Sequence, residues 1–169
     1  MISDPSFFHR DCLELAPALL GKYLCRMQPD GSVRRLRIIE TEAYRGEEDS
    51  ACHAHKGRTR RTEVMYGESG TLYVYLCYGI HWLLNIVSGE VDEPQAVLIR
   101  ACMDARGPGR LTKALGITGE YNGRSLLDCG DLWLEDSESA VVYTTAPRVG
   151  IGYASAEDQA LPWRFILKE

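Results

Sequence analysis

The sequence predicts an α+β fold, in which residues 1–169 form one domain around a curved, mostly antiparallel sheet with a few helices. Three observations predict it. Most apolar stretches are short and alternate with polar residues, as half-buried strands do. Turn-forming residues separate these stretches, and only two of them have helical spacing. No internal repeat, low-complexity segment or linker divides the 169 residues, a length typical of one domain.

A helix followed by a hairpin is predicted at the start of the chain. Residues 13–20 have helical spacing between a capping residue, Asp11, and a terminating residue, Gly21. Pro17 lies inside this stretch and removes one helical hydrogen bond. The hairpin strands are predicted at residues 22–27 and 33–42, around the turn Pro29-Asp30-Gly31-Ser32.

A long polar loop, residues 43–69, precedes the most regular strand pattern. A loop of this length in a compact domain is usually functional or mobile. Residues 72–77 alternate strictly, so that Tyr73 and Tyr75 share one face, whereas Leu72, Val74 and Leu76 lie on the other and face the core. The later elements are a turn at residues 78–81, strands at 82–88, 96–101, 131–134, 141–145 and 163–167, and a helix from Gly107-Pro108 to about Leu115.

The composition is that of an ordinary globular protein, with 45% hydrophobic and 25% charged residues. No apolar run approaches the length of a membrane span, and no signal peptide is recognisable. The six cysteines are scattered without a paired motif, which indicates reduced thiols and a cytoplasmic protein.

The net charge of −5 lies entirely in residues 114–169, whereas residues 1–113 are neutral. Within the neutral part, residues 51–61 carry basic side chains and no acid, and residues 95–113 carry basic side chains against Asp104. On charge alone, these basic residues are expected to be solvated loop residues. Local basic patches of this kind can also hold a phosphate backbone. The basic residues are Lys56, Arg58, Arg60, Arg61, Arg100, Arg106, Arg110 and Lys113.

Glu42 is the strongest candidate for a general base. It lies at the end of a predicted strand and shares a strand face with Glu40. Burial, or crowding by a second carboxylate, raises the pKa of a carboxyl group and suits it to accept a proton from water. The alternative is that both glutamates face solvent.

Four tyrosines, Tyr44, Tyr73, Tyr75 and Tyr78, occur near this position and could be ordinary core and surface residues. Two features favour stacking on a flat ring instead. The aliphatic face of residues 72–77 already supplies the core, and Tyr78 lies at a turn tip where a ring gains little burial. An aromatic wedge there can enter a base stack, and pocket tyrosines can hold an extruded base.

Asn85 and the segment Cys52-His53-Ala54-His55 have open interpretations. Asn85 lies in an apolar strand and needs a hydrogen-bond partner, which is more often structural than a ligand. A three-residue turn would place it opposite Tyr75 on the pocket face, and a two-residue turn would place it on the core face. The Cys-His segment, with Glu42 or Asp49, suggests zinc, but no second Cys/His pair and no His-Glu-x-x-His motif is present. We therefore expect no metal and no cofactor.

These residues resemble the alkyladenine (3-methyladenine/hypoxanthine) DNA glycosylase family. The similarity runs over most of the chain, and its most specific blocks are Glu40-Thr41-Glu42-Ala43-Tyr44 and Gly70-Thr71-Leu72-Tyr73-Val74-Tyr75, in this order. The other matching segments are Leu15-Ala16 through Gly21, His53, Tyr78-Gly79, Asn85-Ile86, Leu98-Ile99-Arg100-Ala101, Gly107-Pro108, Ala114-Leu115-Gly116-Ile117 and Arg148-Val149-Gly150-Ile151-Gly152.

The resemblance implies a monofunctional DNA glycosylase of base excision repair, which flips alkylated or deaminated purines out of duplex DNA and hydrolyses the N-glycosidic bond. It implies that Tyr78 fills the vacated place in the duplex. The base is expected to stack between Tyr44 on one side and His53 with Tyr75 on the other. Asn85 is expected to clash with the 2-amino group of guanine.

For the chemistry, the resemblance implies that Glu42 deprotonates a water held with the help of Arg100 and the Val149 carbonyl. No lysine occupies the place of a nucleophile, so strand cleavage is not expected. The implied partner is damaged double-stranded DNA, without a membrane, for a monomer located in the cytoplasm or, in a bacterium, at the nucleoid. The candidates for contacts to the DNA backbone are Arg58, Arg60, Arg106 and Arg110.

Two departures from the family pattern bear on DNA bending and on the choice of lesion: His81 stands where the family can carry a tyrosine, and Pro94 lies in a longer connection. Two other classes stay open. One is a metal-dependent hydrolase that uses Glu42, His53 and His55. The other is a nucleic-acid-binding module without catalytic activity. The presence of Glu42 and Arg100 argues against this second class.

Overall fold

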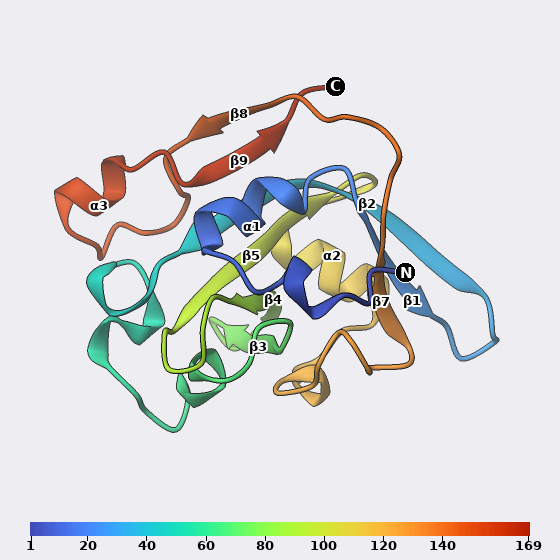
Figure 1. Ribbon diagram of the computed structural model, residues 1–169, viewed down its shortest axis with the longest axis horizontal. Coiled ribbons are helices and arrows are strands. Elements are labelled where there is room, and N and C mark those ends of the chain that lie inside the picture. Colours follow the sequence, from blue (N-terminus) through green and yellow to red (C-terminus); the bar gives the residue numbers. More distant parts are fainter.

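The computed structural model describes residues 1–169 and contains three α-helices and nine strands that belong to one antiparallel sheet (Figure 1). The central strand order is β3-β4-β5-β2-β1-β7, with β6 paired to β5 and β9 joining β8 to β2. The α+β prediction is confirmed. The elements are α1 Cys12–Ala18, β1 Tyr23–Met27, β2 Val33–Tyr44, β3 Leu72–Cys77, β4 His81–Ser88, β5 Gln95–Cys102, β6 Ala105–Arg106, α2 Pro108–Leu115, β7 Leu132–Glu135, β8 Tyr143–Ala146, α3 Ala156–Ala160 and β9 Arg164–Leu167.

Strand β2 is twelve residues long and connects the two parts of the sheet. Its first half pairs with β1, and its second half pairs with β5 and β9. The register with β5 is irregular: Glu40 lies opposite Ala101, but the next residue, Thr41, lies opposite Ile99. Arg100 falls in this irregularity. Because a β-bulge re-aims the side chains beside it, the irregular register turns Arg100 toward the glutamates of β2.

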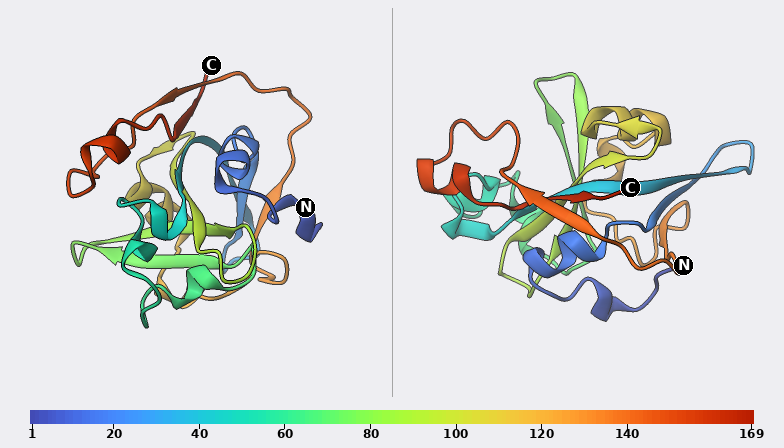
Figure 2. Two further views of the ribbon diagram at one scale, coloured as in Figure 1. Left: turned by 60° about the vertical axis from the view of Figure 1, so that its left-hand side comes forward. Right: turned by 90° about the horizontal axis from the view of Figure 1, so that it is seen from above.

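The β3–β4 hairpin projects from the body of the protein, and its green tip is free in both views of Figure 2. Cys77 pairs with His81, so the loop has three residues and β4 begins one residue earlier than predicted. The predicted alternation of β3 is present, with Tyr73 on the face opposite the core. The expectation that all its aliphatic residues are buried was wrong for Leu76, which is 42% exposed because the hairpin extends beyond the core.

Helices α1 and α2 lie on opposite sides of β2 in the right-hand view of Figure 2. Asp11 caps α1 as predicted, since its Oδ1 accepts the Leu13 N–H at 2.9 Å. Pro17 lies in the last turn of this helix and deprives it of one hydrogen bond. Both helices contribute leucines to a core of thirty buried residues that also includes the aliphatic faces of β3, β4 and β5.

Residues 43–69 are more ordered than the predicted loop. Strand β2 continues to Tyr44, and short 3₁₀ helices follow at Gly46–Glu48, His53–Lys56 and Glu63–Tyr66. Helix α3 and strand β6 were not predicted. All six cysteines are unpaired. None of the helices combines the length and the apolar composition that a membrane crossing requires.

Candidate active site

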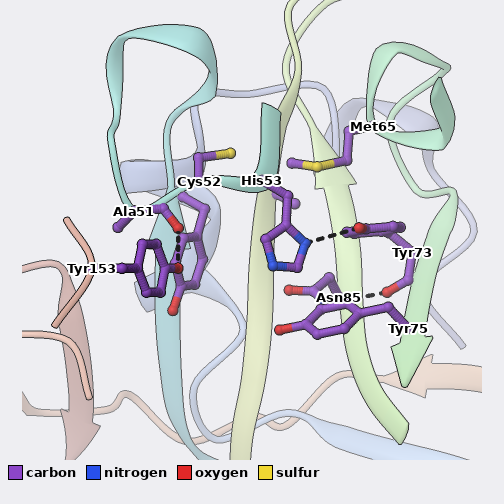
Figure 3. Close-up of a pocket in the computed structure, with 10 residues that line it drawn as sticks. Ala51, Cys52, His53, Met65, Tyr73, Tyr75, Asn85 and Tyr153 are labelled. Atoms are coloured by element: carbon purple, nitrogen blue, oxygen red, sulfur yellow. Dashed lines mark hydrogen bonds between the residues drawn. The ribbon is translucent and has the colours of Figure 1, made fainter. Parts of the chain in front are cut away.

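An aromatic cavity lies where β2, β3 and β4 meet the loop that follows β2 (Figure 3). It brings together Tyr44, His53, Tyr75 and Asn85, the four residues expected to bind a base. Tyr153, which the sequence analysis missed, closes the cavity from the C-terminal segment, and its hydroxyl donates to the Ala51 carbonyl at 2.6 Å. The remaining lining residues are Ala51, Cys52, Met65, Tyr73 and Ala96.

One wall of the cavity consists of His53 and the two β3 tyrosines. The His53 ring centre lies 4.6 Å from that of Tyr75, and its Nδ1 lies 2.9 Å from the Tyr73 hydroxyl. Burial and, to a smaller extent, the nearby cation of Arg61 lower the pKa of His53 to about 4. His53 is therefore neutral at neutral pH, and its ring is held by a hydrogen bond rather than by an ion pair.

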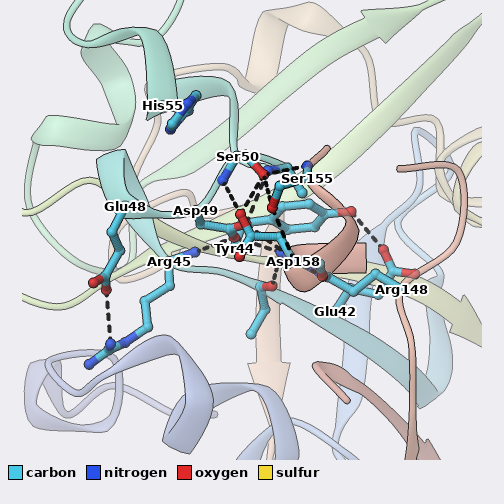
Figure 4. Close-up of polar contacts among 12 residues, drawn as sticks. Glu42, Tyr44, Arg45, Glu48, Asp49, Ser50, His55, Arg148, Ser155 and Asp158 are labelled. Carbon is cyan, nitrogen blue, oxygen red and sulfur yellow. Dashed lines mark hydrogen bonds and ion pairs between the residues drawn. The ribbon is translucent and has the colours of Figure 1, made fainter. Parts of the chain in front are cut away.

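Tyr44 of β2 forms another wall of the cavity, and a buried arginine packs against its ring. The Arg148 guanidinium lies 4.9 Å from the centre of the Tyr44 ring and does not line the cavity, so it contacts the ring from the protein side. Arg148 donates two hydrogen bonds to Asp49, at 2.6 and 2.9 Å, and neither side chain is exposed (Figure 4). A buried ion pair thus fixes the position of Tyr44.

Asn85 lies on the pocket face. A position opposite Tyr75 was expected there, but Asn85 lies opposite Tyr73. The reason is the closing pair of the hairpin, Cys77 and His81. Counting four residues back along each strand from that pair leads to Tyr73 and Asn85. The Asn85 amide nitrogen donates to the Tyr73 carbonyl at 3.1 Å, which fixes the orientation of the side chain.

Glu42 is fully buried, and each of its carboxylate oxygens accepts a hydrogen bond. The Val149 N–H donates to Oε1 at 2.9 Å, and the Tyr44 hydroxyl donates to Oε2 at 2.7 Å. Arg100 Nε lies 3.5 Å from Oε1 and equally far from Oε1 of Glu40, so the two glutamates share a strand face and one cation. Burial raises the pKa of Glu42, against the lowering effects of Arg100, Val149 and Tyr44. A raised pKa suits a group that accepts a proton near neutral pH.

The expected role of Val149 concerned its carbonyl, whereas the structure places its N–H on the carboxylate. Val149 and Arg100 both line a groove outside the cavity, and Glu42 lies behind them. A water molecule on the floor of this groove would therefore meet the backbone of Val149 and the guanidinium of Arg100 next to the buried carboxylate.

The groove has a volume of about 810 Å³ and adjoins the cavity, because Tyr44, His53, Tyr75 and Tyr153 line both. Tyr78 lies at the hairpin tip beside the groove and is 92% exposed. Its backbone has φ of +52°, in the left-handed region that turns require. The cations that line the groove are Arg61, Arg100 and Arg110.

The four arginines expected to bind a DNA backbone differ in their surroundings. Arg110 lines the groove, and Arg60 is exposed without an acidic partner. Arg58 is paired with Asp92, and Arg106 with Glu169. Arg61 was not among the candidates, yet its guanidinium lies 5.2 Å from the centre of the Tyr75 ring.

The Cys-His segment does not assemble a set of metal ligands. The Nδ1 atom of His53 faces the Tyr73 hydroxyl, whereas that of His55 lies 2.7 Å from the Glu47 carbonyl. No three His, Cys, Asp or Glu side chains in the structure come together as a metal site would require.

Comparison with known proteins identifies the family of this chain. The family model described as "Methylpurine-DNA glycosylase (MPG)" matches residues 6–104 and 103–169. The chain therefore belongs to the methylpurine-DNA glycosylase family, whose members are hydrolases of N-glycosyl bonds in DNA.

Relatives of similar length share this similarity. A protein of Methanocella arvoryzae is 44% identical over 94% of this chain and 88% of its own length. A protein of Anaeromyxobacter dehalogenans is 47% identical over 96% of this chain and 80% of its own, and one of Nitrosococcus oceani is 40% identical over 98% and 89%. Each carries the name "Putative 3-methyladenine DNA glycosylase".

Proposed function

We propose that this protein is a monofunctional DNA glycosylase of base excision repair that removes alkylated or deaminated purines from duplex DNA. It acts as a monomer on genomic DNA in the cytoplasm, which in a bacterium lies in the nucleoid. The observation that carries the proposal is the position of Glu42, a buried carboxylate immediately behind the tyrosine wall of an aromatic cavity. The family and its relatives support the class of reaction.

Glu42 acts as the general base for the attacking water. Arg100 and the Val149 backbone hold the water at the floor of the groove, and Glu42 takes its proton as the oxygen attacks C1′ of the flipped nucleotide. The C1′–N bond breaks, and its electron pair leaves with the base. A purine alkylated at N3 or N7 carries positive charge and so departs as a neutral molecule, whereas a neutral purine such as hypoxanthine must take up a proton from solvent to do so.

The protein leaves an intact abasic strand. Cavity and groove contain no lysine, the residue that would form a Schiff base with the sugar. The purine stacks between Tyr44 and the wall of His53 and Tyr75, which is a suitable receptor for a flat ring that has lost its neighbours in the duplex.

Tyr78 fills the gap that the flipped nucleotide leaves. We expect Tyr78→Ala to weaken binding to a duplex with an abasic-site analogue by about 1–3 kcal/mol, the scale of stacking on one aromatic ring. The measurement is a binding titration, with Tyr78→Phe as the matched control because it retains the ring. Tyrosine and alanine both have a Cβ, so the left-handed backbone strains them alike. Equal affinities for all three proteins would move the wedge to another residue.

Asn85 excludes normal guanine. We expect Asn85→Ser to increase guanine release relative to hypoxanthine release, because the shorter side chain removes the collision with the 2-amino group. The collision and the unpaired polar atom it creates cost about 1–3 kcal/mol, or roughly 5- to 150-fold in the rate ratio. The ratio is measured from single-turnover rates on guanine- and hypoxanthine-containing duplexes.

Asn122→Ser is the control for this prediction, since the Asn122 side chain accepts the Val74 N–H in the same hairpin but does not line the cavity. The control should leave the ratio unchanged. If Asn85→Ser also leaves the ratio unchanged and only lowers the melting temperature, Asn85 is a structural amide.

The arginines around the groove hold the DNA backbone. We expect Arg60→Gln and Arg110→Gln each to lower the log–log salt slope of binding by about 0.9 per lost phosphate contact. Arg58 and Arg106 must first leave their acidic partners, so their replacement should lower the slope less. Arg35→Gln is the control, because Arg35 pairs with Glu135 in another part of the sheet. If none of the four substitutions differs from the control, the DNA lies on another face.

An excision panel tests the proposed function. The wild-type protein is incubated with duplexes that contain 3-methyladenine, 7-methylguanine, hypoxanthine or 1,N6-ethenoadenine, with and without EDTA. We expect release of at least one of these bases, an uncleaved abasic strand and no effect of EDTA. Loss of activity in EDTA and its recovery with zinc would favour a metal-dependent hydrolase, and no release from any duplex would leave only a binding module.

A further inference from the structure

Glu42 and Tyr44 are joined by a short hydrogen bond in the candidate active site. They are two residues apart on β2 and share a strand face, which lets the phenol reach back to the carboxylate. The Tyr44 hydroxyl lies 2.7 Å from Oε2 of Glu42 (Figure 4). The ring of the same residue lines the cavity.

The phenol is the donor in this contact. Burial and the neighbouring Glu42 raise the pKa of Tyr44 well above its usual value, so the hydroxyl keeps its proton throughout the neutral range. A carboxylate accepts a hydrogen bond more strongly when it is ionised, and such charge-assisted bonds are short. The contact therefore favours the ionised form of Glu42, in opposition to its burial.

We propose that the Tyr44 hydroxyl is a positioning group for the general base, so that one side chain both carries the stacked base and keeps Glu42 oriented and ionised. This inference rests on the proposed function. The two roles belong to separate atoms of the residue: the ring faces the cavity, and the oxygen faces the carboxylate.

None of the other polar groups around Glu42 donates a hydrogen bond to Oε2. Val149 and Arg100 approach Oε1, and Glu40 lies on the far side of Arg100, where Arg164 of β9 pairs with it at 2.9 Å. Arg148 is engaged by Asp49, and the Tyr153 hydroxyl donates to Ala51. The only hydrogen bond to Oε2 within the protein is that of Tyr44.

Tyr44→Phe separates the two roles, because it keeps the ring and deletes the oxygen. Single-turnover release of 3-methyladenine is followed against pH; this base is positively charged in the nucleotide, so its departure needs no protonation, and it has no 2-amino group to meet Asn85. We expect the acidic limb of the profile to move to higher pH, such that the variant loses about tenfold more activity on the acidic side than on the plateau. Tyr75→Phe deletes a hydroxyl from the facing wall and should leave the position of the limb unchanged.

A second variant and a second measurement complete the test. 3-Fluorotyrosine at position 44 is a stronger donor and should move the limb to lower pH. Carbon-13 NMR of labelled glutamate should show the Glu42 carboxyl titrating at higher pH in Tyr44→Phe, whether or not the protein excises a base. A limb and a titration that do not move would overturn the inference. An inactive wild-type protein would instead overturn the proposed function, and the NMR result would still decide the role of the hydroxyl.

Discussion

Glu42→Gln is expected to slow base release by about 100- to 10,000-fold, the range that a general base contributes. The amide keeps the size and shape of the side chain, and it can still accept the Val149 N–H. It cannot accept a proton from water at any pH near neutrality. Single-turnover excision by wild type and variant measures the loss. Binding to the lesion duplex should be retained, and a turnover close to that of wild type would exclude Glu42 as the base.

The same variant has an expected effect on stability that follows from the raised pKa of Glu42. Because folding raises this pKa, the folded protein holds the proton more tightly than the unfolded chain does. The stabilisation from the proton is present at acidic pH and is lost as the pH rises through the folded pKa. Glutamine does not titrate, so the melting temperature of the variant relative to wild type should increase from acidic to neutral pH. A decrease would mean that the ionised carboxylate is stabilised on balance.

Arg148→Met is expected to lower the stability of the protein by about 3–5 kcal/mol, because it leaves Asp49 buried with an uncompensated charge. For a chain of this size, about 2–4 °C is lost per kcal/mol, so the melting temperature should fall by about 10 °C. Base release should also slow, since Arg148 supports the protein side of Tyr44 and Val149 follows it directly in the chain.

Arg106→Met is the matched control for this prediction. Arg106 forms its ion pair with Glu169 at the surface, where both side chains are more than half exposed and such pairs contribute about 0–1 kcal/mol. Thermal unfolding of both variants compares the stability lost with the buried ion pair and with the surface ion pair. A drop for Arg148→Met no larger than that of the control would show that Asp49 is stabilised by the Arg45 and Ala51 backbone N–H groups alone.

Local patterns in the sequence predicted the fold because they reflect local physics. Strict alternation identified β3, and a capping aspartate identified the start of α1. Helix α3 was not predicted because its five residues include no large apolar side chain and are too few to show a period. The hairpin turn was predicted to within one residue, but the partner of Asn85 was not predicted, since it depends on which residues close the loop.

Strand parity also predicted that Glu40 and Glu42 share a face, and the structure gives them a common contact with Arg100. Parity says nothing of partners far along the chain. Arg148 and Asp49 are ninety-nine residues apart, and nothing in the sequence separates a buried arginine from the solvated majority. The sequence also predicted a role for the ring of Tyr44 but none for its hydroxyl. The contact of the hydroxyl with Glu42 depends on the side-chain conformation, which the sequence does not show.

A crystal structure of the Glu42→Gln variant bound to a duplex with the most rapidly excised lesion tests the central claim most directly. The damaged purine should lie outside the duplex in the aromatic cavity, between Tyr44 and Tyr75, and the ring of Tyr78 should occupy its place in the base stack. A purine that remains stacked in the duplex, or DNA bound to a face without the β3–β4 hairpin, would contradict the account.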